Sequence, residues 1–194
     1  MATKKDFTEL AHFLYETGTL RKTARSHRQT LLTDDLSDNI ASHSFRVAVI
    51  GFLLAEKENA DPNKTAAMCL FHDIGEARSG DQNWIHKKYV KTFDDEILND
   101  QLSNVSQKAL NIANEYEQRD SIEAKIAKDA DLIDQILLLK EYEWTGNKEA
   151  TRWLRGKEQG KRLFTNSAKK LVKEICSQEP SSWWNNLWTA ERRK

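Results

Sequence analysis

Apolar residues recur along the chain at the spacing of an α-helix. The clearest stripe has apolar positions three or four residues apart: Ile122, Ile126, Ala130, Ile133 and Leu137. This spacing places them on one face of a helix. Ser121 is a suitable N-cap, and Gly146-Asn147 breaks the pattern. The pattern therefore predicts a long helix from Ser121 to about Trp144.

Stripes of the same period predict three helices in the first part of the chain. The first contains Phe7, Leu10, Ala11 and Leu14 and stops near Gly18. A second is expected from about Asp38 to Ala55, with its inner face formed by Ile40, Val47 and Leu54. Asp61-Pro62 is a start signal for a third. This third helix is nearly all apolar or small from Thr65 to His72, which predicts a central position.

The remaining segments predict further helices. Residues 83–118 suit one or two more polar helices, with four candidate core residues, Leu98, Leu102, Leu110 and Ala113. Another helix is expected around Phe164, Ala168, Leu171 and Ile175. The tryptophans near the end, Trp183, Trp184 and Trp188, are interpreted as packing residues rather than as a ligand-binding box.

Composition supports an all-α, single-domain protein. Only two Pro and seven Gly occur in 194 residues, of which 39% are apolar and 31% charged. The formal net charge is zero, which argues against binding to nucleic acid polymers or anionic membranes. Cys69 and Cys176 are far apart and do not suggest a disulfide framework. With no signal peptide and no apolar stretch near twenty residues, we expect a cytoplasmic protein.

Candidate chemistry is concentrated in the segment Phe71-His72-Asp73-Ile74-Gly75-Glu76, which Gly80-Asp81 follows. Imidazole nitrogens and carboxylate oxygens are ligands for divalent metals. His43 falls on the inner face of the second helix, and Asp131 lies beside the stripe of the long helix. Packed helices can bring such residues to one point.

Each candidate also has an ordinary structural interpretation. His43 could be a core histidine bonded to a carbonyl, and Asp131 a solvated helix residue with Asp129 and Asp134 as alternatives. Glu76 and Asp81 could belong to a polar loop. The metal-site interpretation is favoured because one chain holds all of these residues in a compatible order.

That order, His43, then His72-Asp73, then Asp131, resembles the HD-domain metal-dependent phosphohydrolases, especially the small 5'-deoxynucleotidases. In Lys128-Asp129-Ala130-Asp131, the family's Lys-x-x-Asp pattern selects Asp131. The resemblance implies a helical bundle with one divalent ion held by His43, His72, Asp73 and Asp131. It also implies catalytic roles for Glu76 and Asp81. The domain would span 1–194, with a core at about 20–142 and a helical extension at about 148–194.

The resemblance further implies an arginine upstream of His43 that binds phosphate. The segment Leu20-Arg21-Lys22-Thr23-Ala24-Arg25-Ser26 selects Arg25, whereas counting fifteen residues back from His43 selects Arg28. In the deoxynucleotidases a Trp follows this arginine and disfavours a 2'-hydroxyl. Neither arginine is followed by Trp here, which predicts weaker discrimination between deoxyribo- and ribonucleotides.

The function that the resemblance implies is hydrolysis of (deoxy)ribonucleoside 5'-monophosphates by a metal-dependent phosphomonoesterase. The alternatives are a phosphodiesterase on the same scaffold and a non-catalytic, metal-stabilised ligand sensor. Two His and two Asp ligands are compatible with Mn, Co, Fe, Zn or Mg. Relatives suggest a homodimer, and the expected partner is a small-molecule nucleotide.

Overall fold

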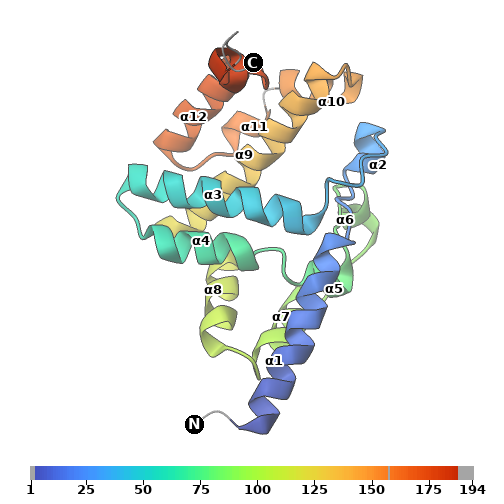
Figure 1. The fold of residues 1–194 in the computed structure, drawn as a ribbon, viewed down its shortest axis with the longest axis vertical. Coiled ribbons are helices and arrows are strands. Elements are labelled where there is room, and N and C mark those ends of the chain that lie inside the picture. The colour runs from blue at the N-terminus through green and yellow to red at the C-terminus, as the bar shows by residue number, and fades with distance from the viewer. Residues whose placement is uncertain (1–2, 157, 188–194) are drawn as a thin grey trace, which may run out of the picture.

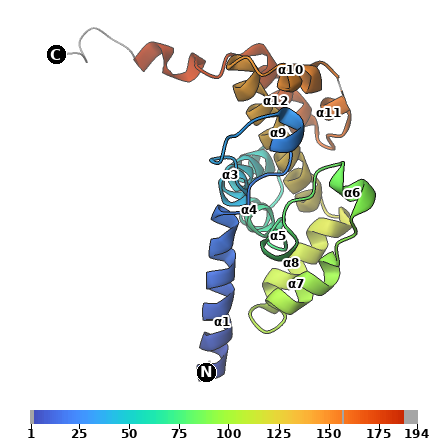
Figure 2. The same ribbon diagram turned by 90° about the vertical axis from the view of Figure 1, so that its right-hand side faces the viewer.

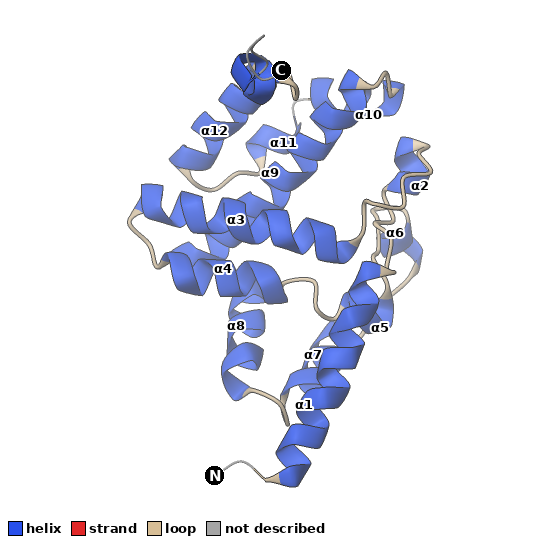
Figure 3. Cartoon of the chain, in the orientation of Figure 1, coloured by secondary structure: helices blue, strands red, loops and turns tan. Residues whose placement is uncertain are grey.

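Three helices form the centre of the molecule in the computed structural model, which describes residues 3–156 and 158–187. They are α3 (Ile40–Glu58), α4 (Pro62–Phe71) and α9 (Ile122–Trp144), and each packs against the other two. In Figure 1, α3 and α4 lie side by side and α9 crosses behind them. The fold is all-α, as predicted, and helices dominate Figure 3.

Local capping explains where these helices begin. The side chains of Asn39, Asp61 and Ser121 each accept a hydrogen bond from a backbone N–H in the first turn that follows. The predicted start signals at Asp61-Pro62 and Ser121 are therefore confirmed. The second helix begins two residues later than predicted and ends three residues later, at Glu58.

The main core lies between these three helices. Its buried side chains include Val47, Leu54, Met68, Ile126 and Ile133. Gly51 of α3 allows α4 to approach closely, because a Cβ at this position would lie 2.5 Å from the Cys69 sulfur. Of the predicted stripe on α9, Ile122 is the exception, since its side chain is 42% exposed.

A second core forms beneath α3, where α1 (Lys4–Thr17) and η1 (Gly18–Arg21) meet later helices. The predicted residues Leu98, Leu102, Leu110 and Ala113 are all buried there. From α1, however, it is Phe13 that is buried, while Phe7, Leu10 and Leu14 are exposed. Figure 2 shows why: most of α1 projects away from the bundle.

The segment between α4 and α9 contains more helices than predicted. After the short α5 (Glu76–Ser79) come α6 (His86–Tyr89), α7 (Asp94–Leu102) and α8 (Gln107–Gln118). Residues 83–118 therefore form three helices rather than one or two. The prediction was wrong because a single turn such as α6 is too short to show a period.

The last part of the chain forms α10 (Lys148–Arg155), α11 (Glu158–Lys161), α12 (Asn166–Ser177) and η2 (Ser182–Leu187), of which only α12 was predicted. Two of these helices, α10 and α12, pack on α9. Phe164 precedes α12 and does not belong to it. Trp183 and Trp184 pack edge to face on each other with ring centroids 4.9 Å apart, but they are exposed rather than core residues. Trp188 lies outside the described residues.

None of the helices in the described ranges is long and apolar enough to cross a membrane. The segment before α3, which contains α2 (Arg28–Leu31), is fixed by a short antiparallel bridge between Ala24 and Asn39. Backbone bonds from Arg25 N–H to the Asp38 carbonyl and from Ile40 N–H to the Thr23 carbonyl accompany it. This bridge holds Arg25 beside the first turn of α3.

Candidate active site

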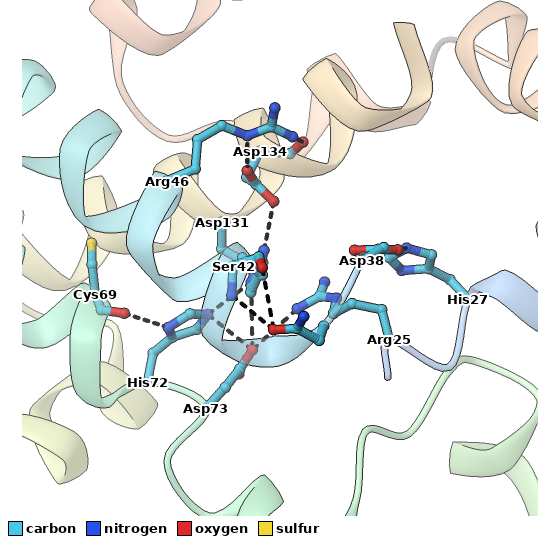
Figure 4. A network of polar contacts seen from close by, with 12 residues as sticks. Arg25, His27, Asp38, Ser42, Arg46, Cys69, His72, Asp73, Asp131 and Asp134 are labelled. Carbon is cyan, nitrogen blue, oxygen red and sulfur yellow. Dashed lines mark hydrogen bonds and ion pairs between the residues drawn. The ribbon is translucent and has the colours of Figure 1, made fainter. Parts of the chain in front are cut away.

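The three central helices bring four predicted ligands to one place. His43 is on the first turns of α3, His72 caps the end of α4 and Asp73 follows it, and Asp131 is near the middle of α9. Figure 4 shows the side chains of His72, Asp73 and Asp131 at this place.

The distances within this group are those of a compact ligand cluster. The Nε2 atoms of His43 and His72 are 3.2 Å apart. Asp73 Oδ2 lies 3.5 Å from His43 Nε2 and 3.1 Å from His72 Nε2. Asp131 Oδ1 lies 3.4 Å from His43 Nε2. His43, His72 and Asp73 could together hold a metal ion. Asp131 lies beside this group through its contact with His43.

The outer nitrogens of both histidines are already bonded. His72 Nδ1 lies 2.7 Å from the Cys69 carbonyl oxygen, which only accepts, so Nδ1 carries the proton. His43 Nδ1 lies 2.6 Å from Asp134 Oδ2 and donates to it in the same way. The two Nε2 atoms are then left as possible metal-binding atoms, and they face each other and two carboxylates. The donor set therefore fits a divalent metal ion.

The ionisation of the carboxylates fits the same ion. Burial would raise the pKa of Asp73, but His72 and His43 outweigh it and hold the pKa well below its usual value. Burial is likewise outweighed at Asp131 by Lys128 and His43, and its pKa is also lowered. Both side chains are therefore anionic at neutral pH, as a metal ion would require of its carboxylate ligands.

A chain of polar groups supports His43 from behind. Asp134 binds His43 Nδ1 with one oxygen and accepts from Arg46 Nε with the other. Arg46 also donates to Glu141 Oε1 at 2.6 Å. Asp134 and Arg46 were not predicted as a pair, because 88 residues separate them in the sequence.

The structure shows which of the two carboxylates, Asp129 or Asp131, lies at the cluster. Asp129 is fully buried and accepts hydrogen bonds from Phe164 N–H at 2.7 Å and from Thr165 N–H and Oγ1 at 2.8 and 2.7 Å. It fixes the start of α12 and does not reach the cluster. Asp131 faces the cluster and accepts from Lys128 Nζ at 2.6 Å.

Glu76 and Asp81 also lie at the site. Burial, together with the charges of Asp73 and Asp81, raises the pKa of Glu76 to about 10, although Arg25 and His43 act in the opposite direction. Glu76 Oε2 is buried without a hydrogen-bond partner in the described part of the chain. Asp81 Oδ2 accepts from Ser26 N–H at 2.6 Å and lies 3.9 Å from Arg25 Nε.

Of the two candidate arginines, Arg25 is the one beside the cluster. Its Nη1 donates to Asp73 Oδ2 at 3.2 Å, and its side chain is buried. Arg28 is at the start of α2 and does not line the cavity of the cluster. It lines a neighbouring depression, which Arg25 and Ser26 also line. Nearby, the His27 ring lies 2.7 Å from Asp38 Oδ2 in a buried pair that stabilises this loop.

The cluster lies in a cavity of about 590 Å³. Besides the predicted residues, its lining includes residues that sequence reasoning missed, among them Trp84, Tyr116, Arg119, Lys128, Trp153 and Arg162. Lys128 is part of the Lys-x-x-Asp pattern and could have been found from it. The others come from short or unpredicted elements and have no local sequence signal.

Comparison with known proteins places this site in a family. The HD domain family model matches residues 17–172. The 5'-deoxynucleotidase HDDC2 of Dictyostelium discoideum is 32% identical over 123 residues, which are 56% of this chain and 65% of that protein. The chain thus spans slightly less than two thirds of the length of this relative.

Solved structures share the fold. A conserved hypothetical protein from Pyrococcus furiosus superposes with a TM-score of 0.75 at 25% identity, covering 87% of this chain and 99% of the other. A protein from Magnetospirillum magnetotacticum, named as a predicted metal-dependent phosphohydrolase, gives a TM-score of 0.67 at 21% identity, covering 91% and 95%. The chain therefore belongs to the HD-domain family, the metal-dependent phosphohydrolases that its motifs resemble.

Proposed function

We propose that this protein is a metal-dependent 5'-nucleotidase that hydrolyses (deoxy)ribonucleoside 5'-monophosphates to nucleoside and phosphate. The observation that carries the proposal is the convergence, at one cavity, of a His-His-Asp cluster with Asp131 beside it, the buried Arg25 and the carboxyl group of Glu76, whose pKa is raised. The similarity to a 5'-deoxynucleotidase supports the choice of substrate.

In this proposal one divalent ion, of Mn, Co, Fe, Zn or Mg, is held by His43, His72, Asp73 and Asp131. Such an ion supplies Lewis-acid chemistry by polarising a phosphoryl oxygen. Arg25 offers a planar guanidinium group that can bind two phosphate oxygens. Because Asp73 and Asp81 hold Arg25 in place, little ordering of its side chain is needed when the phosphate binds.

Glu76 is proposed as the general acid. A carboxyl group with a pKa of about 10 keeps its proton at neutral pH. When water attacks phosphorus and the bond to the 5'-oxygen breaks, Glu76 can give its proton to that leaving oxygen. Asp81, on the neighbouring loop, is proposed to orient the water or the sugar. A non-catalytic sensor would have no evident use for a buried protonated acid beside the cluster.

The nucleoside would occupy the part of the cavity lined by Trp84 and Trp153, which offer aromatic surfaces to a base. A homodimer and a cytoplasmic location remain predictions of this assignment.

The test is phosphate release from a panel of substrates by the metal-loaded protein. The panel pairs dAMP with AMP and adds bis(p-nitrophenyl) phosphate, with each of the five metals supplied in turn. Release from 5'-monophosphates supports the proposal, and the ratio of kcat/KM for dAMP and AMP measures sugar discrimination. Cleavage of the diester alone would favour the phosphodiesterase. Nucleotide binding without any turnover would favour the sensor.

Arg25 and Arg28 form a matched pair for the same assay. Arg25→Ala is expected to lower kcat/KM for every phosphate substrate by about 10²-fold, because a charge-assisted, bidentate contact is lost. Arg28→Ala is expected to change it by less than about threefold. Equal effects, or a larger effect at Arg28, would contradict the assignment of Arg25.

A further inference from the structure

Arg119 occupies an unusual backbone position at the wall of the cavity. It ends α8 with φ = 59°, in the left-handed region that residues other than glycine rarely adopt. This conformation places the guanidinium carbon 3.5 Å from the centroid of the Tyr116 ring.

The guanidinium group of Arg119 is only weakly paired. Its nearest carboxylate is that of Glu117, 4.0 Å from Nη2. Its Nη1 is buried and has no hydrogen-bond partner among the described residues. Buried polar groups normally have a partner, so this N–H group is suited to a ligand that accepts a hydrogen bond. Arg25, by contrast, bonds directly to Asp73.

Arg119 and the metal cluster line the same cavity and are connected through Tyr116. Arg119 stacks on the Tyr116 ring, and the His72 ring packs against the same ring with centroids 5.3 Å apart. Lys128, which donates to Asp131, and Arg162 also line the cavity. Arg119 therefore adds a cationic group one aromatic ring away from the proposed metal ligands.

We propose that Arg119 binds a second phosphate of the substrate, on the sugar and remote from the 5'-phosphate that is hydrolysed. The preferred substrates are then nucleotides of the 3',5'-bisphosphate class rather than simple monophosphates. This inference rests on the proposed function for the identity of the hydrolysed group. A guanidinium stacked on a buried aromatic ring is held in a fixed orientation, which suits it to recognise a phosphate.

The test is equilibrium binding to the Glu76→Gln protein, in which turnover is suppressed and the ligand cluster is intact. Dissociation constants for AMP and adenosine 3',5'-bisphosphate are measured by calorimetry in buffer containing Mn²⁺, with and without Arg119→Ala. We expect the bisphosphate to bind about 10- to 100-fold more tightly than AMP. Arg119→Ala should bring the two dissociation constants close together, and Arg119→Lys should retain part of the difference.

Arg152→Ala is the matched control, because Arg152 is an exposed arginine on α10 that pairs with Glu149. It should leave the ratio unchanged. Equal binding of both ligands by the parent protein would overturn the inference, as would an equal loss for both ligands in Arg119→Ala. Circular dichroism and the Tm establish that each variant is folded.

The same proteins keep the two proposals distinct. If the bisphosphate binds more tightly through Arg119 but the unmodified protein releases no phosphate from either nucleotide, the nucleotidase assignment fails and the second phosphate site stands. If both nucleotides are hydrolysed with equal kcat/KM and bind equally well, the second site fails and the nucleotidase assignment stands.

Discussion

At the scale of single residues, both histidines of the site are oriented by the nitrogen that faces away from the cluster. His72 uses a backbone carbonyl of its own helix, whereas His43 uses Asp134 on another helix. The second arrangement depends on side chains, since Asp134 is itself held by Arg46. The orientation of His43 can therefore be altered by mutating Asp134, without changing a proposed metal ligand.

We predict that Asp134→Asn weakens metal binding by about 10- to 100-fold, the usual effect of changing a group that orients a metal ligand. The amide is uncharged and no longer favours a His43 ring with its Nε2 lone pair facing the cluster. The measurement is the dissociation constant for Mn²⁺ or Zn²⁺, obtained by competition with a chelator. Glu141→Gln, which changes only the outer partner of Arg46, should have a smaller effect. An unchanged constant in Asp134→Asn would show that His43 needs no such support.

Glu76→Gln separates chemistry from metal binding. Glutamine has nearly the same shape but no acidic proton, so kcat should fall by about 10²- to 10⁴-fold, the usual contribution of a positioned acid or base. Metal content, measured by elemental analysis, should stay near that of the parent protein. Unchanged turnover would exclude Glu76 as the acid, and loss of the metal would make it a ligand instead.

Residue-scale prediction from sequence succeeded where a motif was local and failed where tertiary structure decided. Asp129 and Asp131 are two positions apart on a helix, so they point about 200° apart and cannot share a role. Sequence spacing alone did not say which of the two carboxylates faced the cluster of His43, His72 and Asp73. Arg119 carries no motif at all, because its position depends on a left-handed residue at a helix end.

At the scale of elements, the helices that were predicted well are those whose period and caps agree. α9 was predicted at both ends because its stripe, its serine cap and the following glycine are all local signals. The exposed face of α1 shows the limit of periodicity, which reveals an apolar face but not whether another element covers it. The short helices α6, α10 and α11 offered too few turns for a period to be visible.

Gly51 tests how closely α3 and α4 are packed. A Cβ added there would lie 2.5 Å from the Cys69 sulfur and 3.3 Å from Thr65 Cγ2, in the middle of the core. We therefore predict that Gly51→Ala lowers the free energy of unfolding by about 1–3 kcal/mol, the usual cost of overpacking, despite the better helix propensity of alanine. Urea unfolding measures this change.

Gly160→Ala is the control for Gly51→Ala, since no atom lies within 4 Å of a Cβ at Gly160. It should change the free energy of unfolding by less than about 0.5 kcal/mol. If Gly51→Ala were equally neutral, the helices would have room to separate and the close approach would not be required.

At the scale of the whole molecule, the cluster lies where the three central helices of the bundle meet. His43, His72-Asp73 and Asp131 come from α3, the end of α4 and α9, which are the three helices that share the main core. Two carboxylates and two imidazole Nε2 atoms face one another there. An ion bound to all four groups would favour the folded arrangement over the unfolded chain, in which the ligands are separate.

We therefore predict that metal stabilises the protein against heat. At an ion concentration about 100 times the Kd, binding contributes about 2.7 kcal/mol, which for a chain of this size corresponds to a rise in Tm of about 5–10 °C. Differential scanning calorimetry of metal-depleted protein, with and without added Mn²⁺ or Zn²⁺, measures the shift. Asp73→Ala should abolish it, because it removes a ligand, whereas Glu76→Gln should retain it. A rise in Tm that persists in Asp73→Ala would mean that the ion binds elsewhere. No rise in the unmodified protein would show that metal binding does not stabilise the bundle.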